Sequence, residues 1–100
     1  MAVFRVEHSK DYTVISNSLL RDKNLSEKAL GLFARILSLP PQWDFSVEGL
    51  VSICNGNVYS IRTALSELEE KGYLKRNKIR DDQGHFIDIE YIFYEDKLKV

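Results

Sequence analysis

The sequence makes little use of cysteine and proline: one cysteine, Cys54, and two prolines occur among 100 residues. A single cysteine excludes both an internal disulfide and a cysteine-based zinc site, and it is compatible with a reducing cytoplasm. No apolar run approaches the length of a membrane span. Residues 1–8 mix charged with apolar side chains and so lack the apolar run of a signal peptide. We therefore expect a soluble cytoplasmic protein with no membrane partner.

The motifs of common catalytic sites are also lacking. The chain contains no G-x-x-x-x-G-K-[ST] phosphate loop, no G-x-S-x-G nucleophile elbow and no H-E-x-x-H metal-binding helix. Its two histidines, His8 and His85, lie far apart in the sequence, with no cysteine or histidine at ligand spacing beside them. The adjacent acids Asp81 and Asp82 precede a glycine, as turn-forming residues do. We therefore expect no enzymatic activity, no metal site and no cofactor.

Neither sign of charge dominates, since 14 Lys and Arg residues stand against 15 Asp and Glu residues, for a net charge of −1. The charges are nevertheless segregated along the chain. Acidic residues gather in two segments, at Glu67, Glu69 and Glu70 and again at Asp88, Glu90, Glu95 and Asp96. Basic residues gather between them, at Lys71, Lys75, Arg76, Lys78 and Arg80. A basic stripe on a neutral body is compatible with a nucleic-acid partner.

The pattern of apolar residues predicts one domain over residues 1–100, mainly α with a small antiparallel β-sheet (α+β). The alternation in residues 1–16 predicts an N-terminal strand or hairpin, and a short helix through Leu19 and Leu20 follows it. The longer elements are a helix at 26–39, two helices at 46–54 and 57–71, and a β-hairpin at 73–94. Polar residues of the N-cap type stand at the start of the three longer helices: Ser26, Ser46 and Asn57.

Glycines and aromatics give further expectations. Gly31 weakens the helix at 26–39, so we expect a neighbouring element to pack closely against it. Asn55-Gly56 predicts a tight turn in which the glycine takes a positive φ, and Gly72 predicts the end of the helix at 57–71. Trp43 and Phe45 are expected in the core between the helices, and Cys54 is expected there as a small buried residue.

Residues 46–71 form a helix-turn-helix pattern: a short helix, a tight turn, and a second helix with a narrow apolar stripe. Such a unit buries one face of its second helix and leaves the other free to enter the major groove of DNA. Its apolar residues are expected to point inward, which leaves polar, aromatic and basic side chains outward; the inward residues are Val58, Ile61, Ala64, Leu65 and Leu68. The hairpin at 73–94, with its basic first strand, is then the wing of a winged helix. The predicted DNA contacts are Asn57, Tyr59, Ser60, Arg62, Thr63, Lys75, Arg76, Lys78 and Arg80.

The chain also resembles a known group of proteins. Residues 65–74 are similar to the L-x-x-L-E-x-x-G-Y-L exit from the recognition helix of many bacterial winged-helix proteins. Nearly the whole chain resembles the N-terminal winged-helix domain of phage and Firmicute replication proteins, the replisome organisers and DnaD-like primosome components. The resemblance implies binding of double-stranded DNA during replication initiation, self-association as a homo-oligomer, and a helicase loader or helicase as partner. The segments that carry it are residues 4–7, 12–17, 20–26, 37–40 with Trp43-Asp44, and 61–65.

Three functions remain open from the sequence. The helix-turn-helix and its basic wing favour a double-stranded DNA-binding module in replication initiation. A transcriptional regulator of the same fold would carry the same pattern, because fold does not fix function. The net charge and the acidic second half of the helix at 57–71 favour a protein-interaction module without DNA binding. In each of these cases the apolar, β-favouring N-terminal segment is where we expect a contact between copies of the chain.

Overall fold

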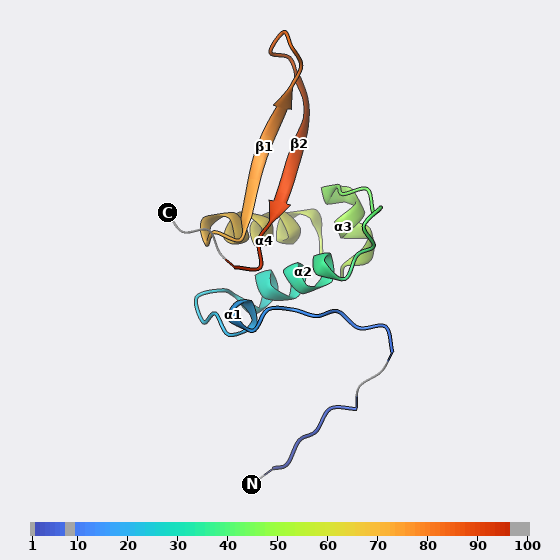
Figure 1. The fold of residues 1–100 in the computed structure, drawn as a ribbon, viewed down its shortest axis with the longest axis vertical. Coiled ribbons are helices and arrows are strands. Elements are labelled where there is room, and N and C mark those ends of the chain that lie inside the picture. The colour runs from blue at the N-terminus through green and yellow to red at the C-terminus, as the bar shows by residue number, and fades with distance from the viewer. Residues whose placement is uncertain (1, 8–9, 97–100) are drawn as a thin grey trace.

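The computed structural model of the chain describes residues 2–7 and 10–96. Within them it has an α+β fold of four helices followed by one antiparallel two-stranded sheet, in the order expected for a winged helix-turn-helix (Figure 1). The hairpin stands out from the helices on one side, and the N-terminal segment leaves them on the other (Figure 1). The elements are α1 (Asn17–Leu20), α2 (Glu27–Leu37), α3 (Val47–Ile53), α4 (Val58–Glu70), β1 (Leu74–Arg80) and β2 (Phe86–Phe93).

Side-chain caps begin the three longer helices where the sequence predicted them. The Ser26 Oγ accepts a hydrogen bond from the Ala29 N–H at the start of α2, and the Ser46 Oγ accepts one from the Gly49 N–H at the start of α3. Asn57 begins α4 with a reciprocal capping box: its side chain accepts from the Ser60 N–H, and the Ser60 Oγ accepts from the Asn57 N–H. Each cap satisfies backbone donors that a helix leaves without an internal partner.

The end of α4 sets the direction of the hairpin. Gly72 takes a φ of +90°, and the N–H groups of Gly72 and Tyr73 donate back to the carbonyls of Glu69 and Leu68. This pair of bonds is the Schellman motif, which requires a left-handed residue just past the helix. The predicted end of the helix at Gly72 is therefore confirmed, and β1 begins two residues later, at the C-terminal end of α4.

The core lies between α2, α3 and α4 and continues under the base of the hairpin. At its centre the fully buried Phe33 ring of α2 meets the rings of Tyr73 and Phe93, with centroids 6.1 Å and 5.6 Å away. Trp43 and Phe45 pack against this core from the segment between α2 and α3 and remain half-buried. The buried apolar residues are Leu19, Leu25, Ala29, Leu32, Phe33, Leu50, Ile61, Ala64, Leu65, Leu68, Tyr73 and Leu74.

The predicted N-terminal strand or hairpin within residues 1–16 is wrong for the part that the structure describes. Residues 2–7 and 10–15 form neither strand nor helix, and the side chains of Val3, Phe4 and Val14 are 80% or more exposed. Alternating apolar residues favour a strand only where a neighbouring strand takes up the backbone hydrogen bonds. Here the segment lies on the side of the helices opposite the hairpin (Figure 1), so neither strand of the sheet is beside it.

Four local expectations also fail. A Cβ placed on Gly31 would have no atom within 4 Å, so no close packing accounts for this glycine. Gly56 does not take a positive φ; its lack of a side chain instead leaves room for the Ser60 Oγ, which would lie 2.8 Å from a Cβ there. Val58, expected inward, is 43% exposed because it begins α4 beyond the edge of the core. Cys54 caps the end of α3 and is only half-buried.

Candidate nucleic-acid interface

The two faces of the hairpin differ in charge. In an antiparallel pair, residues directly opposite each other share a face. The pairs Arg76–Tyr91 and Lys78–Ile89 therefore lie on one face, and the pairs Asn77–Glu90 and Ile79–Asp88 lie on the other. We call the first of these the inner face, because Arg76 on it reaches α4 and Tyr91 on it contacts Phe45. Along the regular part of the ladder, cations without acids occupy the inner face, and the acids of β2 occupy the outer face.

Lys75 belongs to the outer face, since it pairs with Ile92 and not with the residues that look toward α4. Its side chain is exposed, as is that of Lys78. Neither lysine forms an ion pair within residues 2–7 and 10–96. The basic first strand predicted from the sequence is thus split, and only part of it looks toward the exposed side of α4.

The side chain of Arg76 is engaged in contacts within the protein. Its guanidinium donates to both carboxylate oxygens of Glu69 on α4, at 3.0 Å and 3.3 Å, and it is half-buried. The hydrogen bonds that Arg76 donates to Glu69, together with the charge of Glu69 and a hydrogen bond to Tyr91, raise the pKa of Arg76, although burial works against this. Arg76 therefore ties the base of the wing to the last turn of α4 through its Nε and Nη2 atoms.

Arg80 lies at the far end of β1, where the ladder is irregular. The register shifts between Ile79 and Arg80, so that Ile87 of β2 is paired with no residue of β1. The Arg80 Nη1 donates to the Gly84 carbonyl across the turn, at 3.1 Å. Beside it the Asp81 carboxylate accepts from the backbone of Gln83 and His85, which lowers the pKa of Asp81. These contacts give the turn its shape.

On α4 the predicted contact residues divide into capping groups and exposed groups. Asn57 and Ser60 are engaged with each other in the capping box. The Thr63 hydroxyl donates to the Tyr59 carbonyl one turn earlier, at 2.9 Å, while its methyl group stays exposed. Tyr59 is 76% exposed, and Arg62 is exposed and forms no ion pair or hydrogen bond with the described residues. Tyr59 and Arg62 are therefore the groups on α4 that are free to meet a ligand.

A groove of about 310 Å³ separates the hairpin from the helices. Phe45, Ser46 and the first two residues of α3 form one wall, and Arg62 of α4 forms a second side. On β2 the lining residues are Phe86, Asp88, Ile89 and Tyr91; Asp88 pairs on the outer face but lies next to the register shift and also lines the groove. Figure 1 shows β2 as the strand nearer to α3. Because Lys78 pairs with Ile89 on the inner face, it stands on the hairpin beside this groove.

Most of these groove residues were not expected from the sequence. Phe45 was expected only in the core, and Glu48, Phe86, Ile89 and Tyr91 were not singled out as site residues. The alternation in β2 is a signal for Ile89 and Tyr91, since it places both on the face that carries Arg76 and Lys78. The position of Phe86 depends on the irregular register near the turn, and no sequence pattern indicates it.

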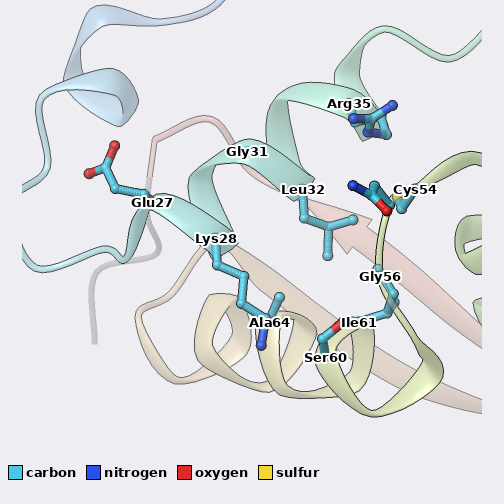
Figure 2. A pocket seen from close by; sticks show the side chains of 11 residues that line it. Glu27, Lys28, Gly31, Leu32, Arg35, Cys54, Gly56, Ser60, Ile61 and Ala64 are labelled. Carbon is cyan, nitrogen blue, oxygen red and sulfur yellow. The ribbon is translucent and has the colours of Figure 1, made fainter.

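A second space, of about 230 Å³, lies on the opposite flank of α4 (Figure 2). It is bounded by α2, by the turn at 54–56 and by Ser60 and Ala64 of α4. Lys28 reaches across it toward α4 and Glu27 points away from it (Figure 2). The Arg35 Nη1 at its other end donates to the Ile53 carbonyl, at 3.0 Å, and so satisfies the end of α3. This space is separate from the groove that contains Arg62.

Comparisons with family models, with curated proteins and with solved structures find no match for this chain. Across residues 2–7 and 10–96, no helix is long and apolar enough to cross a membrane. In that same part of the chain, no three His, Cys, Asp or Glu residues are grouped closely enough to hold a metal ion. His85 contacts Asp81 at the hairpin turn, at 3.3 Å, whereas His8 lies outside the described residues.

Proposed function

We propose that this chain is a double-stranded DNA-binding module that uses the exposed side of α4 and the inner face of the wing. One observation carries the proposal. Arg62 on α4 lines the groove and Lys78 on β1 pairs with Ile89, which also lines it, and neither cation forms an ion pair among the described residues. Two such cations held by separate elements can contact DNA on either side of an inserted helix.

The acids next to α4 do not oppose this arrangement as strongly as the sequence implied. Glu67 is bound to Ser26 on the flank away from the wing, and Glu69 is paired with Arg76. The half of α4 that begins at Asn57 presents Tyr59, Arg62 and Thr63 without any acid. This polarity along the helix supports entry of its N-terminal half into a major groove.

A role in replication initiation, together with a helicase loader or helicase as partner, is the specific form of the proposal, and it rests on the resemblance described above. A transcriptional regulator would use the same surface. The neighbouring genes would discriminate between them, because a helicase loader or a single-strand-binding protein nearby favours replication.

The test is binding of a short labelled duplex by fluorescence anisotropy at increasing salt. We expect binding at low salt and a logarithmic salt slope of about −0.9 for each phosphate contact. Arg62→Gln should weaken binding about tenfold, within the range for loss of one arginine contact to DNA. Arg21→Gln is the matched control, because Arg21 is also exposed but follows α1, away from the wing. Absence of binding at low salt, or equal effects of both variants, would contradict the proposal.

Self-association through the N-terminal segment is a second candidate function, favoured by a separate observation. Val3, Phe4, Tyr12 and Val14 are between 77% and 95% exposed. Apolar side chains gathered at this density on one exposed segment mark an interaction site. Sedimentation velocity should show association that a Phe4→Ser, Val14→Ser double variant abolishes. A monomer at every concentration of the unaltered chain would exclude this candidate.

A further inference from the structure

The groove between α3 and the wing offers exposed apolar surface beside aromatic rings. Phe45 and Tyr91 contact each other at its base, with ring centroids 4.6 Å apart and planes tilted by 42°. Phe86 on β2 is 55% exposed and Ile89 is 36% exposed, so neither is covered by the rest of the chain. Surfaces of this kind bind flat ring systems, because every nucleobase has a π-face that stacks on an aromatic or apolar side chain.

The polar groups of the groove are of both signs. Arg62 supplies guanidinium donors and forms no ion pair with the described residues. Glu48 and Asp88 supply carboxylate acceptors. A phosphate would be attracted by the one cation and repelled by the two carboxylates. A nucleobase edge carries both acceptors, which suit arginine, and amino donors, which suit carboxylates. The charge pattern therefore fits a base better than the phosphate backbone.

A cation that could bind the phosphate of the same nucleotide lies on the hairpin beside the groove. Lys78 pairs with Ile89 on the inner face and is exposed and unpaired, so it stands on the hairpin next to the groove. A base seated against Phe86 and Ile89 would leave its phosphate within reach of that ammonium group. A base that is already unpaired enters most readily, because extruding a paired base from a duplex costs a few kcal/mol.

We propose that this groove binds one unpaired nucleobase of a DNA strand whose duplex part is held by α4. The inference rests on the proposed function, since it requires that the chain bind DNA. It adds a preference for DNA with an unpaired base, such as a bulge or a locally opened site. Phe86 is the specificity-determining residue, because it lines the groove, is 55% exposed and has no charged or hydrogen-bonding group with which to contact the duplex backbone.

The experiment compares a labelled duplex with the same duplex carrying one unpaired adenine, by fluorescence anisotropy with the full chain. We expect the bulged duplex to bind about tenfold more tightly, as for one base stacked on an aromatic side chain. Phe86→Ala should remove most of that preference, because it should weaken binding of the bulged duplex far more than binding of the fully paired one. Ile87→Ala is the matched control, because Ile87 is 60% exposed on the same strand and does not line the groove. Circular dichroism of both variants checks that the hairpin is retained.

The outcomes separate this inference from the proposed function. Equal binding of both duplexes by the unaltered chain would overturn the base-binding groove and leave duplex binding intact. Equal weakening of both duplexes by Phe86→Ala would also overturn it, because Phe86 would then act in general DNA contact. If Phe86→Ala changes the sedimentation of the chain but not its preference, a second copy occupies the groove and the inference fails. Binding of neither duplex would overturn the proposed function together with the inference.

Discussion

The carboxylate of Glu67 on α4 accepts two hydrogen bonds from Ser26, one from its backbone N–H at 2.6 Å and one from its Oγ at 2.7 Å. Ser26 also caps α2 by accepting from the Ala29 N–H. One residue pair thus fixes the start of α2 against the second half of α4. The bond from the Ser26 backbone, followed by that from its hydroxyl, lowers the pKa of Glu67 below its ordinary value, and burial only partly offsets this.

Replacing this carboxylate should destabilise the fold in a pH-dependent way. We expect Glu67→Gln to lower the free energy of unfolding at neutral pH by about 1 kcal/mol, since a bond to a charged acceptor is replaced by a neutral one. A lowered folded-state pKa stabilises the protein above the ordinary pKa of glutamate, and this stabilisation is lost as pH falls through the folded-state value. The difference between the two proteins should therefore shrink in acid. Urea denaturation at neutral and acidic pH measures it.

Glu70→Gln provides the control, because Glu70 is exposed on the same helix and has no hydrogen bond or ion pair with the described residues. Its stability should match that of the unaltered chain at both pH values. A Glu67→Gln deficit that stays constant down to strongly acidic pH would show that the charge of Glu67 plays no part in holding Ser26.

Gly31 occupies an exposed position inside α2 with open space around it. Glycine within a helix costs about 1 kcal/mol relative to alanine, and a Cβ at Gly31 would meet no atom within 4 Å. We therefore expect Gly31→Ala to raise the free energy of unfolding by about 1 kcal/mol, measured by urea denaturation. An unchanged or lower stability would indicate that something covers this face of α2 in solution.

Gly49 is the opposite case on α3. A Cβ there would lie 2.9 Å from the Cη2 atom of Trp43 and 3.0 Å from the Oγ of Ser46, which caps the helix. Overpacking of this kind costs about 1–3 kcal/mol, which exceeds the gain in helix propensity of about 1 kcal/mol. Gly49→Ala should therefore lower the stability by about 1 kcal/mol, with a change in Trp43 fluorescence. A stabilised variant would mean that Trp43 moves aside without cost.

The sequence predicts the helices and the hairpin well because their signals are local. The caps at Ser26, Ser46 and Asn57 and the glycine at position 72 each act on backbone groups within a few residues. The N-terminal strand failed for the converse reason. Whether Phe4 and Val6 join a sheet depends on a partner strand, and alternation carries no information about where such a partner lies.

The candidate site was less predictable because it depends on pairing between distant segments. Lys75, Arg76 and Lys78 are close neighbours in sequence, but the strand register puts Lys75 on the outer face. Arg76 lies on the inner face, but its guanidinium group is bound to Glu69. This ion pair cannot be predicted from the sequence, because it depends on the angle between α4 and β1. Composition alone describes all three as one basic stripe.

Tyr73 is almost fully buried, and its hydroxyl donates to the Asp22 carboxylate at 2.5 Å. Burial, followed by the hydrogen bond and the negative charge of Asp22, raises the pKa of Tyr73 to about 12 from an ordinary value of 10.0. Between these values the unfolded chain loses its phenolic proton while the folded chain keeps it. Stability should therefore fall as pH rises from 10 to 12, by an order of 2–3 kcal/mol in total.

Tyr73→Phe removes this group from the titration, so its loss of stability over the same pH interval should be smaller. At neutral pH the variant should already be less stable, because Asp22 loses a hydrogen-bond donor. Tyr59→Phe, at a position that is 76% exposed, should behave as the unaltered chain does. Identical alkaline loss in all three proteins would show that Tyr73 ionises as freely in the folded state as in the unfolded state.

The two exposed lysines of β1 test which side of the wing meets DNA. Lys78 lies on the inner face opposite Ile89, and Lys75 lies on the outer face opposite Ile92. Both side chains are positively charged and exposed, so the two lysines differ in the face of the hairpin that they occupy. If the duplex contacts α4 and the inner face, Lys78→Gln should weaken binding and reduce the magnitude of the salt slope by about 0.9, the value for one phosphate contact. Lys75→Gln should change neither quantity, because its ammonium group points away from the duplex. Anisotropy titrations at several salt concentrations measure both.

Equal reductions in slope for the two variants would show that attraction to the whole wing, and not contact with its inner face, governs binding. A reduction for Lys75→Gln alone would place the duplex on the outer face, beside Asp88 and Glu90, and the surface assigned to Arg62 and Lys78 would then be the wrong one.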